Sequence, residues 1–416
     1  MDAKTKGAWL VHHTHKLQQV NGVHEFDNIY AAGKAAILLS ALSGTDQTSL
    51  TRNKVELLAK AANINTVFEL PKLLELLEAR TLVEVSKTGV DVIGVTTTAV
   101  VQHATGVYED LGPSASENAA LEFSEVTSEG PVRQKDSRAY LADKCKLSSG
   151  QVIGLLEQAE QVGFVDFEEL GGDKVYFNGN LFRREHIAKT QAVLDSLTPE
   201  DRKHVAEVED LLKRCGCVAL TEITKLLGVK LLEKLNAISM YDINVVNNDQ
   251  ENVAFVTRPA AFSKYGNPLV EDALDLAKAF VSSLTYGMTR SSYTRGRITM
   301  IEKLMKALIA GRWVGPVTAI GQDYRALELK GVVEVRPNPP RGYDMRLLKK
   351  EVGQVALEVI KAGDASDAVL NLPGATVTGY VGPEANREGG RRKQTLASKK
   401  ATRDIVMALR TGGGLQ

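Results

Sequence analysis

The apolar residues of this sequence change their period four times in the same way, from a helical period to an alternating one. The first change falls at Arg80, where the run 70–79 gives way to 82–86, a turn at 88–89 and then 90–95. Apolar residues three and four apart are typical of a helix with one buried face, whereas strict alternation is typical of a half-buried strand. The pattern therefore predicts a helix that leads directly into a β-hairpin.

Three further copies of this pattern follow along the chain. Their helix, first strand, turn and second strand are 148–161, 164–167, 171–172 and 174–177 in the second copy, 230–240, 243–246, 247–250 and 252–257 in the third, and 317–330, 332–336, 337–342 and 343–348 in the fourth. Two more segments of helical pattern precede each copy, namely 28–42 and 51–62, 117–125 and 137–145, 199–215 and 220–227, and 271–284 and 300–310. We therefore expect three helices and a two-stranded hairpin in each copy.

This order of elements resembles the winged-helix superfamily, in which a helix-turn-helix is followed by a β-hairpin called the wing. The resemblance covers about residues 28–350 and rests on architecture and patterning rather than on a diagnostic motif. It implies a mainly α fold with small β-hairpins (α+β), made of tandem winged-helix domains. The implied divisions are a polar N-terminal segment 1–27, winged helix 1 at 28–98, an acidic connector 99–114, winged helix 2 at 115–182, winged helix 3 at 183–262, winged helix 4 at 263–362, and a basic C-terminal extension 363–416 with a short helix.

Composition narrows the class of protein further. The chain is 44% hydrophobic and 25% charged, which is the balance of an ordinary globular protein. No apolar run approaches the roughly 20 residues that cross a bilayer, and residues 1–20 lack the apolar core of a secretory signal. The three cysteines cannot make a disulfide framework. We expect a cytoplasmic protein without membrane contact.

The motifs of common enzyme classes are missing from the sequence. Neither GxxxxGK[ST], nor GxGxxG between a strand and a helix, nor a GxSxG nucleophile elbow occurs. The carboxylate pair Glu168 and Glu169 falls in a predicted wing strand and is expected to be solvated. We therefore predict a protein that is not an enzyme, with no catalytic residue, no cofactor and no small-molecule substrate.

Two clusters of metal-ligating residue types need an interpretation. The first contains His12, His13 and His15, with His24 as a possible fourth ligand. It could bind a transition metal, but we favour a solvated N-terminal segment because this spacing is not specific. The second, Cys215 and Cys217, lacks the further pair of ligands of a structural zinc site, so we interpret both cysteines as buried apolar residues beside a strand at 217–220. No metal site is expected.

Charge is distributed unevenly along the chain, although its formal total is zero. Residues 286–416 contain 22 lysines and arginines against 12 aspartates and glutamates, a difference of +10. The remaining residues contain 29 against 39, a difference of −10. The last third is therefore basic, and a basic surface favours nucleic acid as a partner.

The fourth copy carries the polar side chains that a DNA interface requires. A winged helix typically places its third helix in the major groove and its wing on the phosphates or the minor groove. At spacings of four and three, Thr318, Gln322 and Arg325 would share one face of the expected helix 317–330. The predicted nucleic-acid-binding residues are Arg290, Arg295, Arg297, Thr318, Gln322, Arg325, Lys330, Arg336, Arg341, Arg346, Arg391, Arg392 and Lys393.

The third helices of the first two copies carry carboxylates instead. Glu75 and Glu78 stand in the first, and Glu157 and Glu160 in the second, where they would repel phosphates. These copies are expected to bind protein partners or another copy of the chain.

Two functions follow from this contrast. The first is a double-stranded-DNA-binding regulator or targeting subunit, in a transcription, mobile-element or defence context. The second is a non-catalytic interaction scaffold in a multisubunit complex, whose basic tail meets an acidic partner. The acidic stretch 109–129 is a further candidate partner for the basic surface, which it would bind and cover in the same chain or in a second chain.

Overall fold

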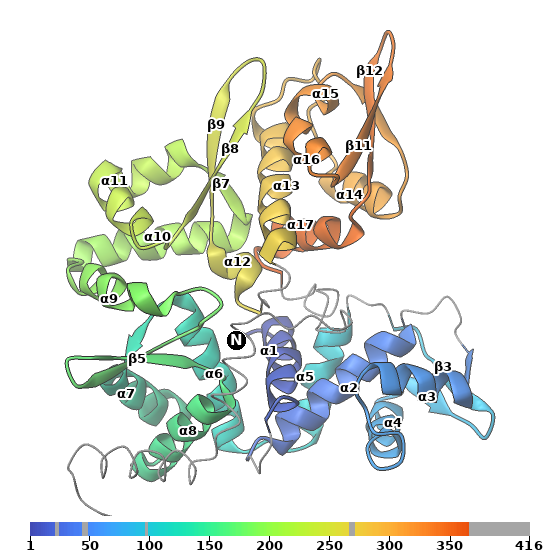
Figure 1. The fold of residues 1–416 in the computed structure, drawn as a ribbon, viewed down its shortest axis with the longest axis vertical. Helices are drawn as coiled ribbons and strands as arrows, with labels where there is room; N and C mark the ends of the chain where they lie inside the picture. Colours follow the sequence, from blue (N-terminus) through green and yellow to red (C-terminus); the bar gives the residue numbers. More distant parts are fainter. Residues whose placement is uncertain (21–24, 44–48, 96–98, 266–270, 366–416) are drawn as a thin grey trace, which may run out of the picture. The chain divides into compact units, whose positions relative to one another are not determined.

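The computed structural model describes residues 1–20, 25–43, 49–95, 99–265 and 271–365 (Figure 1). The chain divides into two compact parts between Asn178 and Gly179, here called the N-terminal and C-terminal halves. The described residues are mostly helical, with small antiparallel sheets of three strands, which confirms the expected α+β class. Within these residues, no helix is both long enough and apolar enough to span a membrane.

One order of elements occurs four times in the described residues: a helix, a short strand, two helical segments and a hairpin. The first copy consists of α2 (Asp27–Ser43), β1 (Ser49–Thr51), α3 (Arg52–Ala61), α4 (Leu70–Ala79), β2 (Val83–Val85) and β3 (Gly89–Val92). The second consists of α6 (Ala115–Glu129), β4 (Val132–Arg133), α7 (Gln134–Cys145), α8 (Ser149–Val162), β5 (Asp166–Leu170) and β6 (Asp173–Phe177). Both lie in the N-terminal half.

The C-terminal half contains the other two copies. The third consists of α10 (Pro199–Cys215), β7 (Cys217–Ala219), α11 (Leu220–Asn236), β8 (Asp242–Asn247) and β9 (Asn252–Thr257). Its α11 is two helices joined at Gly228, whose φ of 71° breaks the helix between the expected helical segments 220–227 and 230–240. The fourth consists of α14 (Ile301–Ile309), β10 (Val314–Val317), α15 (Ile320–Asp323), α16 (Arg325–Leu329), β11 (Val333–Asn338) and β12 (Gly342–Leu347).

Further helices surround these copies. They are α1 (Ala3–Leu17), α5 (Val100–Asp110), the 3₁₀ turn η2 (Arg184–His186), α9 (Ile187–Asp195), α12 (Pro259–Ser263), α13 (Glu271–Thr289) and α17 (Lys350–Ala362). Helix α5 lies within the segment 99–114, the expected acidic connector.

Each sheet has a third strand, and only that of the third copy, β7, was expected from the sequence, at 217–220. The short strand after the first helix of a copy pairs with the second strand of the hairpin, so the strand orders are β1-β3-β2, β4-β6-β5, β7-β9-β8 and β10-β12-β11. All the pairs are antiparallel; in the first copy Leu50 lies opposite Val90, and Val83 opposite Val92. The expected two-stranded wings are therefore three-stranded sheets. Strands of two to four residues are too short to show a period in the sequence.

Local sequence signals set the helix ends in the second copy. The hydroxyl of Ser148 accepts a hydrogen bond from the backbone of Gln151, whose side chain accepts one from the backbone of Ser148. This reciprocal capping box begins α8. Gly163 ends the helix in the left-handed region with a φ of 75°, where glycine is favoured. Both the start and the end agree with the sequence prediction.

The expected helix 317–330 of the fourth copy is wrong. Val317 is the last residue of strand β10, and the rest of the segment forms two short helices, α15 and α16, separated at Tyr324. Strand β10 is held by long-range pairing with β12, where Val314 lies opposite Met345. A partner 31 residues away decides this structure, so a local period could not reveal it.

The expectation of a polar, solvated N-terminal segment is also wrong. Asp2 caps helix α1 by accepting hydrogen bonds from the backbone of Lys4 and Thr5, at 2.9 and 3.0 Å. Trp9 is fully buried, and α1 packs against α2 and α5. The helix crosses α2 so closely that a Cβ on Gly33 would lie 1.9 Å from the side-chain oxygen of α1 residue Thr14.

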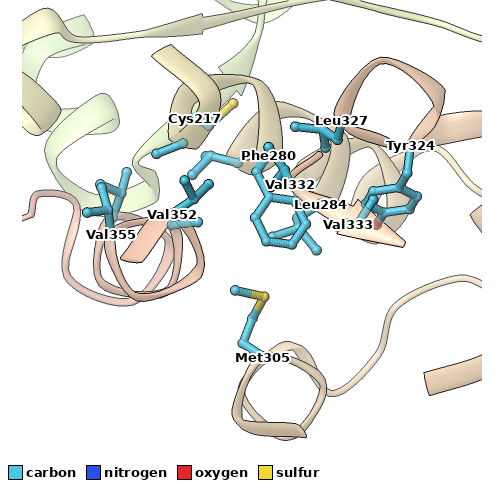
Figure 2. Close-up of a cluster of buried hydrophobic side chains, with 14 of the residues drawn as sticks. Cys217, Phe280, Leu284, Met305, Tyr324, Leu327, Val332, Val333, Val352 and Val355 are labelled. Carbon is cyan, nitrogen blue, oxygen red and sulfur yellow. The ribbon is translucent and has the colours of Figure 1, made fainter. Parts of the chain in front are cut away.

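The third and fourth copies share one hydrophobic core. Figure 2 shows Phe280 and Leu284 of α13 among Cys217 of β7, Tyr324 beside α16 and Val352 of α17, all buried. A second, smaller core lies between α10 and α11. The expected strand at Cys217 and the burial of this residue are confirmed, whereas Cys215 is exposed, contrary to expectation. The shared core joins the two copies into one structural body.

Candidate nucleic-acid interface

The loop after α13 presents two of the predicted arginines, Arg290 and Arg297, to solvent. The guanidinium of Arg297 lies over the ring of Tyr293, 5.5 Å from the centroid, and its Nε donates to the carbonyl of Met288 at 3.1 Å. Tyr293 itself is 75% exposed. A cation beside an exposed aromatic ring can meet both the phosphate and the base of a nucleic acid.

The β11–β12 hairpin, which is the predicted wing of the fourth copy, carries three more arginines. Arg336 and Arg346 both lie over the ring of Trp313, at 4.0 and 5.0 Å from its centroid. Trp313 is not among the residues predicted from the sequence, although a tryptophan among arginines is a usable signal. Each of these two arginines also pairs with a carboxylate from the opposite strand, Asp344 at 3.2 Å and Glu334 at 2.6 Å. The tryptophan and the ion pairs hold both guanidinium groups in place.

The loop and the wing meet at Thr318. The carbonyl of Arg295 accepts hydrogen bonds from the hydroxyl of Thr318 at 3.4 Å and from the backbone of Ala319 at 3.0 Å. On the other side, a Cβ on Gly342 would lie 2.6 Å from the carbonyl carbon of Val317, so the wing tip lies directly against this segment. Its neighbour Arg341 is exposed at the tip. The fold thus brings Thr318, Arg341 and the 290–297 loop together.

Arg295, also predicted to contact DNA, lies inside the fold and is only 8% exposed. One guanidinium nitrogen, Nη2, donates to Oδ1 of Asp323 at 2.7 Å and to Oε1 of Gln322 at 2.9 Å. The same Asp323 oxygen accepts from Nδ2 of Asn248 at 2.9 Å. Burial raises the pKa of the Asp323 carboxyl, and the hydrogen bonds from Arg295 and Asn248 offset part of that effect. Arg295 and Gln322 here fix the loop to α15.

The turn of the third copy's hairpin covers part of the face on which Arg325 stands. The two oxygens of Asp249 each accept a 2.9 Å hydrogen bond from the guanidinium of Arg325, a bidentate pair between residues 76 apart in sequence. In the same turn, Glu251 accepts a bond of 3.1 Å from the hydroxyl of Tyr286. Lys330 is exposed at the end of α16. The structure therefore separates Thr318, Gln322 and Arg325, which the sequence analysis placed on one helical face.

The segment that contains the 290–297 loop, the fourth copy and α17 remains strongly positive despite these pairs. Residues 286–362 contain 14 lysines and arginines and seven aspartates and glutamates, a difference of +7. The three remaining predicted residues, Arg391, Arg392 and Lys393, lie outside the described residues. The basic surface of the fourth copy thus depends on the wing and the loop.

The histidines considered as metal ligands are placed by the fold of the N-terminal half. His13 is fully buried, stacks on Phe164 with ring centroids 3.8 Å apart, and shares a hydrogen bond of 2.9 Å with the hydroxyl of Ser124. Burial, with a smaller effect of the Lys16 charge, lowers the pKa of His13 well below its usual value of 6.5. His24 lies outside the described residues. Among the residues that are described, no group of three or more His, Cys, Asp or Glu side chains could hold a metal ion.

Comparison with known proteins does not identify a relative. No protein-family model matches the chain, and no curated protein matches its sequence.

Proposed function

We propose that this chain is a DNA-binding protein of tandem winged-helix type, in which each of the four copies is one winged helix. The order of elements supports this, because a winged helix has a helix, a short strand, a helix-turn-helix and a hairpin. The repeated strand order, with the short strand next to the second hairpin strand, supports it as well. The breaks at Gly228 and Tyr324 fall where the turn between the second and third helices would lie.

The observation that carries the proposal is that the 290–297 loop and the tip of the β11–β12 hairpin both lie against the 317–319 segment. The loop carries the exposed Arg297, with the exposed Tyr293 beside it, and the hairpin tip carries the exposed Arg341. Arginine suits phosphate contacts because its planar guanidinium donates two parallel hydrogen bonds. The fourth copy would contact the phosphates of the DNA backbone with these side chains. Such contacts supply affinity and fix the orientation of the protein on the duplex.

The ion pair between Arg325 and Asp249 limits how the fourth copy reads bases. A guanidinium that is already bidentate to a carboxylate does not also bind guanine bidentately. The proposed interface is therefore the wing and the loop, with the short helix α16 in a secondary role. Such a protein fits a regulator or a targeting subunit, in a transcription, mobile-element or defence context, and no catalytic step is part of the proposal.

A salt titration of duplex-DNA affinity tests the proposal. The logarithm of the binding constant should fall linearly with the logarithm of salt concentration, with a slope set by the number of phosphates neutralised. Arg341→Ala should weaken binding to all sequences alike and reduce this slope by about one. Arg214→Ala, at the end of α10, is the matched control and should leave the slope unchanged. Absence of binding at low salt, or an unchanged slope in Arg297→Ala/Arg341→Ala, would refute the proposal.

A second candidate function, a protein-interaction scaffold, is favoured by one feature of the first copy. Val67 and Phe68, in the turn between α3 and α4, are 70% and 73% exposed. Large apolar side chains that stand together on a surface are typical of a protein contact. For this role, Phe68→Ser should reduce binding of a protein partner or of a second chain without changing DNA affinity. Sedimentation velocity measures the self-association case directly.

A further inference from the structure

A groove lies on the first copy, between α3, α4 and the β2–β3 hairpin. Its volume is about 230 Å³. Apolar side chains line most of it, namely those of Val55, Leu70, Pro71, Leu74, Val85 and Val90. Three carboxylates, those of Glu56, Glu75 and Glu78, line the same groove, together with Arg52, whose Nε lies 3.7 Å from Glu56 Oε1, so the lining keeps a net negative charge. An apolar groove with acidic side chains suits a ligand that presents aliphatic side chains flanked by cations.

The acidic side of the groove is built into helix α4. Glu75 and Glu78 are three residues apart and so share a helical face. Oε1 of Glu78 also accepts a hydrogen bond of 2.9 Å from the backbone of Val85, which fixes the hairpin against the helix. These carboxylates would repel the phosphates of DNA. The groove is therefore a surface for protein, of the kind that receives one amphipathic helix.

The chain itself contains a segment of matching chemistry, residues 396–410, LASKKATRDIVMALR, which lies outside the described residues. Ala401, Ile405 and Leu409 are spaced by four, which is the spacing of an apolar stripe on a helix. The segment has four lysines and arginines against one aspartate, a difference of +3. Its charge is opposite to that of the three groove carboxylates.

We propose that the groove of the first copy binds residues 396–410 of this chain, either its own or those of a second copy. The apolar stripe would occupy the groove, and Lys399, Lys400 and Arg403 would meet the carboxylates of α4. Between Ala365 and this segment lie 30 residues, 366–395, which reach roughly 100 Å when extended. The proposal rests on the protein-docking role of the first copy and does not depend on DNA binding by the fourth.

Site-specific cross-linking of the full chain tests the docking. A photoreactive phenylalanine analogue replaces Leu74, which lines the groove, and the cross-linked peptides are identified by mass spectrometry. The same analogue at the exposed Pro71 gives a second probe if the first variant does not fold, as judged by circular dichroism. The analogue at Ile153 on α8, which is 43% exposed, is the matched control. Mixing ¹⁵N-labelled and unlabelled protein shows whether a cross-link joins one chain or two.

The expected product joins the groove probe to residues 396–410, and the Ile153 probe does not give it. Ile405→Asp/Leu409→Asp should reduce its yield at least tenfold. Glu75→Lys should also reduce the yield, and Lys399→Glu/Lys400→Glu in the same chain should restore it, because the charges are exchanged. Cross-links from the folded groove probes to any other segment, no cross-link at all, or a yield that these variants do not change would overturn the proposal. DNA affinity measured on the same variants separates this outcome from failure of the DNA interface.

Discussion

Replacement of Glu117 by alanine should destabilise the N-terminal half. This carboxylate is only 2% exposed, and it holds the starts of two helices. Oε1 accepts from the backbone nitrogens of Asn28 and Ile29, at 2.8 and 3.2 Å, near the start of α2. Oε2 accepts from the backbone of Ser114, at 2.9 Å, before α6, and from Nδ2 of Asn28, also at 2.9 Å.

The size of the effect follows from these contacts. Glu117→Ala leaves three backbone N–H groups without an acceptor, and each unsatisfied buried donor costs about 1–3 kcal/mol. Water can reach part of the site, so we take the lower value for each group. The free energy of unfolding of this half should therefore fall by about 3 kcal/mol. Glu117→Gln keeps one acceptor oxygen and should cost about half as much.

The two tryptophans allow the measurement, since Trp9 lies in the N-terminal half and Trp313 in the C-terminal half. In a Trp313→Phe background, fluorescence during urea denaturation reports on the N-terminal half alone. Glu122→Gln on the same helix is the control; Glu122 makes an ion pair with Lys144, which is mostly exposed, so its loss should cost under about 1 kcal/mol. If Glu117→Ala costs no more than this control, the carboxylate does not hold the two helices.

Two further predictions concern the helices around α1. The pKa of His13 is lowered by burial, so the unfolded chain binds a proton that the folded chain does not, and stability should fall as pH drops below about 6.5, by about 1.4 kcal/mol per pH unit. Urea titrations at pH 8 and pH 5.5 should show a smaller pH-dependent loss in His13→Gln, and equal losses would contradict this explanation. A Cβ on Gly33 would also lie 2.6 Å from a backbone oxygen of α1, so Gly33→Ala should lower the free energy of unfolding by about 1–3 kcal/mol. A Cβ on Gly154 in α8 would meet nothing within 4 Å, so Gly154→Ala should raise the free energy of unfolding by up to about 1 kcal/mol. Thermal unfolding of the two alanine variants checks this contrast, and a Gly33→Ala protein as stable as the parent would argue against a tight crossing of α1 and α2.

The hairpins were predictable because their signals are local. The change of apolar period after α4 and the capping box of α8 need only neighbouring residues. Strand β10 and helix α1 were not predictable in this way. Strand β10 depends on pairing with β12, and the polar sequence of α1 is buried through contacts with α2 and α5. Tertiary context overrides composition and local propensity at such places.

The basic character of the candidate site was predictable from the sequence, but the arrangement of its side chains was not. The excess of arginine in the fourth copy is visible in the sequence, and Arg341 and Arg297 do stand on its surface. The buried position of Arg295 and the pairing of Arg325 with Asp249 are decided by residues 28 and 76 positions away. Neither partner stands at a spacing from which a local pattern could reveal the contact.

The common core of the third and fourth copies has a consequence for how such a protein can vary. Repeated domains on flexible linkers can be exchanged or lost one at a time, because each folds alone. Here Phe280 and Leu284 contribute to a core that also contains Cys217 of the third copy, and Asp249 of the third holds Arg325 of the fourth. Elements that share a core open together as one cooperative unit. We therefore expect the two copies to be gained, lost or transplanted only together. Removal of one copy would expose the apolar core surface of the other, which would then need new residues to cover it.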